Sequence, residues 1–263
     1  MTEQHLNVED FHPTERFTTK AQDYALFRPR YPAELMQLLR ENGAIRPNMV
    51  VADIGSGTGI LTEQLLREGC EVFAIEPNRA MRAKAEELLG RLNRFHSIAS
   101  RAEDTMLPDA SVDLIAIGQA FHWFDLAPTR VEFLRILKPE GFLCLVWNSR
   151  DPVGGDFEND YKLLVEECCP ANQKVKDLGP SVEEIADFYG GEHIHVFLPN
   201  HQDLDLGGLK GRFMSASYAP DEHEPGYVRA MESLERLFAQ HAVDGKVRLH
   251  YRTEVYLGRM DRG

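Results

Sequence analysis

The sequence predicts an α/β domain with a mostly parallel sheet that helices cover on both faces. In the first half, short apolar runs alternate with stretches whose apolar residues recur at helical spacing, which is typical of β-α-β units. The apolar runs do not alternate with polar residues, as expected for strands buried on both sides. The length of 263 residues suits one large domain, because single cores stop growing at roughly 250–300 residues.

The elements of the first half follow in regular order. Strands are predicted at residues 49–54, 72–75, 95–99, 112–117 and 142–147. Helices are predicted at residues 33–42, 60–67, 78–89 and 128–137. Asn78 is the expected cap of the third helix, and residues 138–141 are expected to form a turn before the fifth strand.

The pattern changes after Asn148. Residues 151–155 form a turn-rich break, residues 156–169 have helical character, and Ser181 with Glu184 forms a capping box before a short helix. A sixth strand is predicted at 193–198, a helix around 227–238, and an antiparallel strand near the sheet edge at 247–257, where apolar and polar residues alternate. These segments predict helical insertions after strands five and six, over the strand ends where open α/β sheets bind ligands.

Charge and composition exclude several classes of protein. With 29 Lys and Arg against 42 Asp and Glu, the net charge is −13, and a chain this acidic lacks the positive field that nucleic acids require. No run approaches the ~20 apolar residues that span a bilayer. Residues 1–20 are polar without an apolar signal core, and the four cysteines form no C-x-x-C pair. We therefore expect a cytoplasmic protein with neither a nucleic-acid nor a membrane partner.

A glycine-rich turn carries the functional argument. The apolar strand ending at Ile54 runs into Gly55-x-Gly57-x-Gly59, which opens a helix. Glycine can take positive φ and let a ligand touch the backbone, and the helix start presents unpaired N–H groups. An acid, Glu76, follows 17 residues after Gly59 at the end of the second strand, where it can accept both hydroxyls of a ribose. Together these features predict a nucleoside-cofactor site.

The charge pattern distinguishes between cofactors. The glycine spacing differs from the G-x-G-x-x-G fingerprint of dinucleotide sites. Asp53, two residues before the first glycine, would repel a pyrophosphate and attract an ammonium group. S-adenosylmethionine carries an α-amino group, a ribose and an adenine but no phosphate, so the pattern favours it over NAD.

The segment resembles motif I of class I S-adenosylmethionine-dependent methyltransferases, with Ser56 where many relatives carry Cys. The pattern Tyr24-x-x-x-Arg28-Pro29-x-Tyr31-Pro32 resembles the N-terminal segment of a small-molecule branch that includes trans-aconitate methyltransferase-like proteins. Further similarity lies in Glu76-Pro77-Asn78, in residues 102–109, in the loops at 120–124 and 147–151, and in residues 252–256. The resemblance implies a Rossmann-like, seven-stranded sheet whose last strand is antiparallel. It also implies an N-terminal segment (1–32) over the cofactor site and one domain (33–263) with cap insertions near 151–192 and 204–241.

The resemblance implies S-adenosylmethionine as cofactor, S-adenosylhomocysteine as product, and a role for each matching residue. The glycines would approach the methionine part, Asp53 would lie near its amino group, and Glu76 would hold the ribose. Ala102 and Glu103 would border the adenine. The full set implied to bind the cofactor is Arg28, Asp53, Gly55, Ser56, Gly57, Gly59, Glu76, Pro77, Ala102, Glu103, Gln119 and Ala120.

Methyl transfer makes modest demands on the protein. The methyl group on a sulfonium is already activated, so much of the rate can come from holding the nucleophile about 3–3.5 Å away and in line. A base is needed only if the acceptor carries a proton. His122, in an aromatic cluster after the fourth strand, is the candidate base; alternatively it packs within its loop or orients the substrate. The candidate substrate-binding residues are Tyr24, Tyr31, Trp123, Arg150 and Arg212.

The predicted function is methyl transfer from S-adenosylmethionine to a small-molecule acceptor, with a carboxylate as one candidate, by a monomer or homodimer. The alternatives are a non-catalytic S-adenosylmethionine-binding protein and an NAD-dependent oxidoreductase. No metal site is predicted: His193 and His195 share one strand face, but no other ligand spacing supports chelation.

Overall fold

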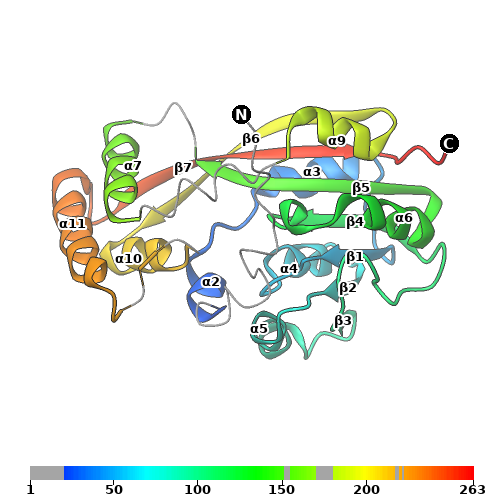
Figure 1. Ribbon diagram of the computed structural model, residues 1–263, viewed down its shortest axis with the longest axis horizontal. Helices are drawn as coiled ribbons and strands as arrows, with labels where there is room; N and C mark the ends of the chain where they lie inside the picture. Colours follow the sequence, from blue (N-terminus) through cyan, green and yellow to red (C-terminus); the bar gives the residue numbers. More distant parts are fainter. Residues whose placement is uncertain (1–20, 151–154, 170–179, 217–218, 221) are drawn as a thin grey trace, which may run out of the picture.

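The computed structural model describes residues 21–150, 155–169, 180–216, 219–220 and 222–263. Its centre is one seven-stranded sheet in the order β3-β2-β1-β4-β5-β7-β6 (Figure 1). The strands are β1 (Val50–Ile54), β2 (Glu71–Ile75), β3 (Phe95–Ile98), β4 (Val112–Gly118), β5 (Leu137–Arg150), β6 (His193–Leu204) and β7 (Val247–Gly258). The first five strands pair in parallel, and β7 is antiparallel to both β5 and β6. The predicted fold class is therefore confirmed.

Helices connect and cover the strands. They are α2 (Ala21–Phe27), α3 (Ala33–Glu41), α4 (Ile60–Arg67), α5 (Arg79–Leu89), the 3₁₀ turn η2 (Phe121–Trp123), α6 (Leu126–Ile136), α7 (Asp156–Cys168), α9 (Val182–Tyr189), α10 (Leu206–Met214) and α11 (Pro225–His241). Two expected start signals are confirmed. The Asn78 side chain accepts from the N–H groups of Ala80 and Met81, and Ser181 with Glu184 forms the capping box of α9.

Two strands extend beyond their predicted bounds. The turn expected at residues 138–141 lies inside β5 as an irregularity, because the pairing with β4 passes from Leu137 directly to Phe142. β6 continues to Leu204 instead of ending near residue 198, since residues 199–204 pair with β7. The prediction of an antiparallel strand near the sheet edge is confirmed, since β7 is antiparallel and lies one position inside the edge strand β6.

Helix α10 was not predicted. Its sequence contains three glycines, which have low helix propensity. The helix forms because Asp205 caps it, with the carboxylate accepting from the N–H of Gly208 at 2.7 Å, and because Leu209 and Phe213 are buried. At Gly211 the Phe27 ring packs so closely that a Cβ would lie 2.4 Å from it.

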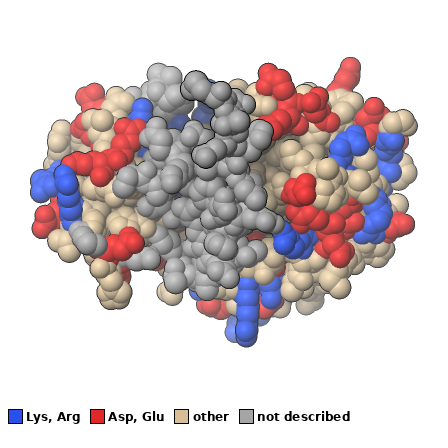
Figure 2. Space-filling model, in the orientation of Figure 1, with Lys and Arg blue, Asp and Glu red and all other residues tan. Residues whose placement is uncertain are grey.

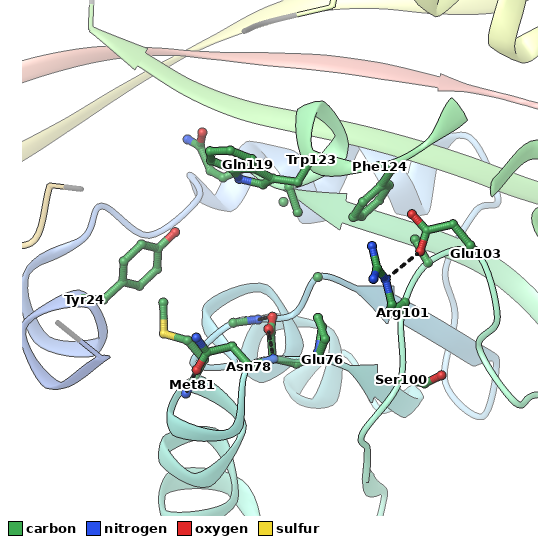
Figure 3. Close-up of a pocket in the computed structure, with 16 residues that line it drawn as sticks. Tyr24, Glu76, Asn78, Met81, Ser100, Arg101, Glu103, Gln119, Trp123 and Phe124 are labelled. Carbon is green, nitrogen blue, oxygen red and sulfur yellow. Dashed lines mark hydrogen bonds and ion pairs between the residues drawn. The ribbon is translucent and has the colours of Figure 1, made fainter. Parts of the chain in front are cut away.

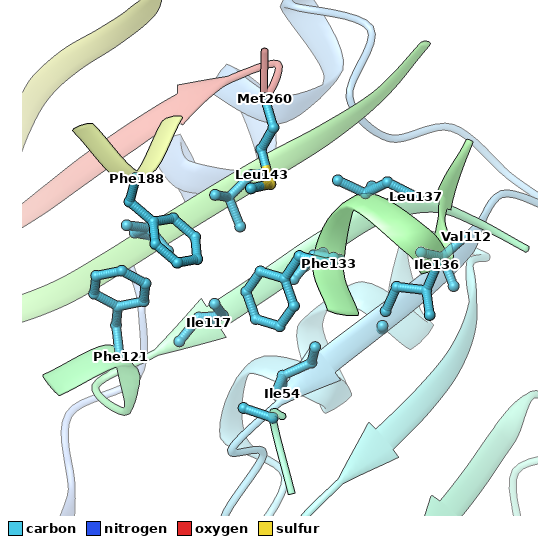
Figure 4. Packing of buried hydrophobic residues seen from close by; sticks show 14 of the residues in the cluster. Ile54, Val112, Ile117, Phe121, Phe133, Ile136, Leu137, Leu143, Phe188 and Met260 are labelled. Carbon is cyan, nitrogen blue, oxygen red and sulfur yellow. The ribbon is translucent and has the colours of Figure 1, made fainter. Parts of the chain in front are cut away.

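Two hydrophobic clusters lie on the two faces of the sheet. One packs α6 and α9 against β4 and β5 through Phe133, Phe188 and Ile117 (Figure 4). The other packs α3 and α4 through Leu39 and Leu65. This arrangement confirms the prediction of burial on both sides for β1 and β4, whose residues are mostly buried, whereas the residues of the edge strand β3 are only partly buried.

A third cluster joins α7, α10 and α11 with the start of β7. These three helices lie together at the end of the molecule where β5 ends, whereas α9 lies along the sheet (Figure 1). The helical insertions after strands five and six are thus confirmed. Parts of the predicted N-terminal segment (1–20) and of the first insertion (151–154 and 170–179) lie outside the described residues.

Candidate functional site

A cleft opens at the carboxyl ends of β1, β2 and β4. It has a volume of about 800 Å³, and a second pocket of about 510 Å³ adjoins it. Residues that line both pockets are Tyr24, Gly55, Gly57, Gly118 and Gln119. In Figure 3, Tyr24 stands at one side of the cleft and Glu103 at the other, with Trp123 and Phe124 above and Glu76 and Met81 below. The cleft lies where open α/β sheets bind ligands.

The glycine turn forms one wall of the cleft. Gly55, Gly57 and Gly59 all have positive φ, at 70°, 57° and 86°. At Gly55 a Cβ would lie 2.4 Å from the Ala120 side chain, whereas at Gly57 it would meet nothing within 4 Å. Gly57 therefore presents bare backbone to the cleft.

Gly59 has a different environment from the other two glycines. It is the N-cap of α4, and a Cβ there would lie 2.6 Å from Leu89 of α5. It is not among the lining residues of either pocket, whereas Gly55, Ser56 and Gly57 are. The structure thus brings two of the three glycines to the cleft and the third to a helix–helix contact.

Asp53 is a buried carboxylate with one oxygen left over. It lines the second pocket and is 1% exposed. Its Oδ2 accepts a hydrogen bond from Thr62 at 2.5 Å, but Oδ1 has no hydrogen-bond partner among the described residues. Burial raises the pKa of Asp53 to about 7, against the hydrogen bonds from Thr62, which lower it. A buried acceptor without a donor is costly, so this oxygen is suited to an ammonium group of a ligand.

Replacing Asp53 by Asn is expected to stabilise the ligand-free protein in a pH-dependent way. The pKa is higher in the folded protein than in the unfolded chain, where it is about 4. Stability is therefore lost as pH rises from about 4 to about 7. Because Asn stays neutral and can still accept from Thr62, the gain in melting temperature should be larger at pH 8 than at pH 4.5. An equal gain at both pH values would contradict a perturbed Asp53.

Glu76 fixes the glycine turn to the start of α5. Its Oε2 accepts from the N–H of Gly57 at 2.9 Å, and its Oε1 accepts from the N–H of Asn78 at 2.8 Å. The side chain is 8% exposed, and burial raises its pKa. These bonds hold the carboxylate at the floor of the cleft (Figure 3), where each oxygen keeps a lone pair for a ligand hydroxyl.

The far end of the cleft combines predicted and unpredicted residues. Pro77, Ala102 and Glu103 line it as expected. Glu103 accepts from the N–H of Asp125 at 3.2 Å and pairs with Arg101 at 3.3 Å. Met81, Ser100, Arg101 and Gly118 also line the cleft and were not predicted, and the same holds for Asn78, predicted only as a cap, and Phe124, predicted only as part of the aromatic cluster.

The loop after β4 closes the top of the cleft. Gln119, Ala120 and Trp123 line it as predicted, and Gln119 has a positive φ of 62°. His122 is half-buried beside Trp123, with ring centroids 4.7 Å apart, and does not line either pocket. Burial lowers the pKa of His122 to about 4.

Cationic and phenolic side chains gather in the second pocket. Arg28, Tyr24, Tyr31 and Arg212 line it together with Asp53. The Arg28 guanidinium lies 4.8 Å from the Tyr24 ring centre and donates to the Ser215 carbonyl at 3.0 Å.

The other two predicted arginines lie in different settings. Arg212 is 6% exposed and donates from Nε to the Tyr251 hydroxyl at 2.9 Å. Arg150 instead lies 5.4 Å from the Tyr161 ring of α7 and lines neither pocket.

The two strand histidines lie away from the cleft. His195 contacts Glu254 at 2.7 Å and stacks on Tyr256, and His193 stacks on Tyr189. Among the described residues, no three His, Cys, Asp or Glu side chains gather as a metal site would require.

Acidic and basic side chains are interspersed on the face shown in Figure 2. In the part of the chain that the structure describes, no helix is long and apolar enough to cross a membrane.

Comparison with known proteins points to one family. A sequence model described as "methyltransferase domain" matches residues 52–145. An uncharacterized methyltransferase of Schizosaccharomyces pombe is 33% identical over 221 residues, covering 79% of this chain and 82% of the relative. An uncharacterized methyltransferase of Mycobacterium tuberculosis is 39% identical over 128 residues. This match covers 49% of this chain, and it spans about half (50%) of the length of the relative.

Solved structures share the fold. A candidate type II methyltransferase from Anaeromyxobacter dehalogenans superposes with a TM-score of 0.64 at 22% identity, covering 89% of this chain and 98% of that one. The phosphoethanolamine N-methyltransferase 2 of Haemonchus contortus, in complex with phosphomonomethylethanolamine and S-adenosylhomocysteine, superposes with a TM-score of 0.57 at 15% identity. This match covers 99% of this chain and 62% of that one. At these identities the likeness concerns the fold.

Proposed function

Because the chain belongs to the class I S-adenosylmethionine-dependent methyltransferase family, we propose that it transfers a methyl group to a small-molecule acceptor that bears a carboxylate. The observation that carries the cofactor part of the proposal is the Oδ1 atom of Asp53, a buried acceptor without a donor among the described residues, beside the bare backbone of the glycine turn. The Haemonchus contortus protein, which shares the fold, holds a small molecule together with S-adenosylhomocysteine.

The residues of the cleft fit the parts of the cofactor. Asp53 would accept from the amino group, Arg28 would pair with the carboxylate, and Glu76 would accept from the ribose hydroxyls. Ala102 and Glu103 would border the adenine. S-adenosylmethionine supplies a methyl group on a positively charged sulfur, already activated for displacement. Trp123 and Gln119 would exclude water around that position, with the Trp123 ring suited to a cation.

Arg212 is the proposed anchor of the acceptor. It is buried, its Nε donates to the Tyr251 hydroxyl, and it lines the pocket that also contains Asp53 and Tyr31. A guanidinium in a partly dry pocket favours a carboxylate, which it can bind through two parallel hydrogen bonds. The trans-aconitate methyltransferase-like branch stays our proposal for the subgroup. Arg150 has less support as an anchor, because it lies over Tyr161.

The experiment that tests the function is a turnover assay with a panel of small carboxylic acids. We expect one acid to gain the mass of a methylene group while S-adenosylhomocysteine accumulates in equal amount. Tight cofactor binding without turnover on any acceptor would favour the non-catalytic alternative.

We further propose that the protein acts in the cytoplasm, as a monomer or homodimer, and not on nucleic acid. Its net charge of −13 supports the last point.

His122 stays the proposed base for an acceptor that must lose a proton, although it lines neither pocket of the ligand-free protein, so the proposal requires its ring to reach the acceptor once ligands are bound. Its lowered pKa of about 4 keeps the ring neutral, and so able to accept a proton, across the physiological range. We expect His122→Asn to lower kcat about 100-fold with little change in cofactor affinity. The acidic limb of the wild-type pH–rate profile should then lie near pH 4. Unchanged turnover in the variant would assign His122 to packing in its loop.

A further inference from the structure

The connector between α2 and α3, residues 28–32, is held to the sheet by side-chain amides. It lies outside the helices and strands, so its carbonyl groups need other partners. Gln64 donates from Nε2 to the Tyr31 carbonyl at 2.9 Å, and Gln202 donates to the carbonyl of Phe27, just before the connector, at 3.1 Å. The Arg30 carbonyl accepts from Asn200 Nδ2 at 2.8 Å and from Asn148 Nδ2 at 3.3 Å.

Asn148 and Asn200 are themselves joined. Asn200 Nδ2 also donates to Asn148 Oδ1 at 3.1 Å, and the buried hydroxyl of Thr253 donates to the same oxygen at 2.5 Å. These three side chains come from β6, β5 and β7, which are neighbours in the sheet. The connector is therefore fixed to three adjacent strands through one hydrogen-bonded node.

The same connector carries side chains of the second pocket. Arg28 and Tyr31 line that pocket together with Asp53. Tyr31 is buried so tightly that a Cβ at Gly118 would lie 2.4 Å from its hydroxyl. The N–H of Arg28 still donates to the Tyr24 carbonyl at 3.2 Å, and its guanidinium donates to the Ser215 carbonyl at 3.0 Å. The residues that follow it are held by side-chain amides, so the amide node contributes to where the Arg28 guanidinium stands.

We propose that Asn200 and Asn148 are positioning residues, which hold the connector so that Arg28 meets the carboxylate of the cofactor's methionine part. The inference rests on the proposed function, because it names what Arg28 binds. Asn148 also lines the second pocket, whereas Asn200 lines neither pocket. The proposal therefore predicts that Asn200 sets cofactor affinity without touching the cofactor.

The test is the substitution Asn200→Asp, which keeps the shape of the side chain. The new carboxylate can still accept from the N–H of His201, as Asn200 Oδ1 does at 2.9 Å. It loses both donated bonds and places a negative charge against two oxygen acceptors. The matched control is Asn159→Asp on the exposed surface of α7, which makes the same change of charge.

Two readouts are needed. In ligand-free protein, we expect Asn200→Asp to accelerate hydrogen exchange of the backbone amides of Arg28, Arg30 and Tyr31, with little change in the control. By calorimetry, it should weaken S-adenosylhomocysteine binding about tenfold. With Arg28→Ala in the background, it should add almost nothing, since the affected contact is already gone.

The outcomes separate the two claims. Unchanged exchange, faster exchange with unchanged affinity, or a full additive loss in the double variant would each overturn the positioning role. Wild-type protein that fails to bind S-adenosylhomocysteine, while Asn200→Asp still accelerates exchange, would overturn the proposed function and leave only the node.

Discussion

Replacing Gly57 by Ala is expected to abolish S-adenosylhomocysteine binding, whereas replacing Gly43 by Ala is expected to leave it intact. The two glycines have similar φ, 57° and 71°, and a Cβ at either meets nothing within 4 Å. Each substitution should cost about 1–2 kcal/mol of folding free energy, because a side chain is strained at positive φ. Only Gly57 lines the cleft, so only its methyl group would occupy ligand space.

Calorimetric titration and chemical denaturation of both variants measure the effect. We expect an affinity loss above about 100-fold for Gly57→Ala, with a free energy of unfolding close to that of Gly43→Ala. If both variants bound S-adenosylhomocysteine equally well, the glycine turn would not form the part of the cleft that contacts the cofactor.

Glu76→Gln is the second variant with a large expected effect. Both carboxylate oxygens accept backbone N–H bonds, from Gly57 and Asn78. A glutamine has one oxygen, so its amide nitrogen would face one of these donors and the turn would lose its anchor. The ribose would also lose an acceptor. We expect S-adenosylhomocysteine affinity to fall about 100-fold.

Glu71→Gln provides the control for that variant. Glu71 begins the same strand and pairs with His96 at 2.9 Å, away from the cleft. Its replacement should leave affinity within about twofold, as for an exposed ion pair. Thermal melts of both variants confirm folding before binding is measured. If folded Glu76→Gln bound S-adenosylhomocysteine as tightly as the wild type, Glu76 would not be the residue that holds the ribose.

The central strands and the glycine turn could be predicted because their signals are local. Buried apolar runs mark β1, β2 and β4, and Asn78 marks the start of α5 through bonds to the next turn of the chain. The position of Asp53 and Glu76 beside the turn also follows from sequence, since both end neighbouring parallel strands.

The features that were missed depend on contacts between distant segments. The end of β6 forms only by pairing with β7, and α10 overrides its glycines through packing of Phe213. Gly59 lines neither pocket and instead lies against the Leu89 side chain of α5, a contact between distant segments. The node of Asn148 and Asn200 joins residues more than 100 positions from the connector, and nothing in the local sequence indicates that.

The most direct measurement is calorimetric titration of the wild-type protein with S-adenosylhomocysteine and, separately, with NADH. The cleft pairs bare glycine backbone with two buried carboxylates, Asp53 and Glu76, which attract an ammonium group and repel a pyrophosphate. We predict one-site binding of S-adenosylhomocysteine and no heat with NADH. Binding of NADH, or no binding of S-adenosylhomocysteine by folded protein, would contradict the assignment of this cleft.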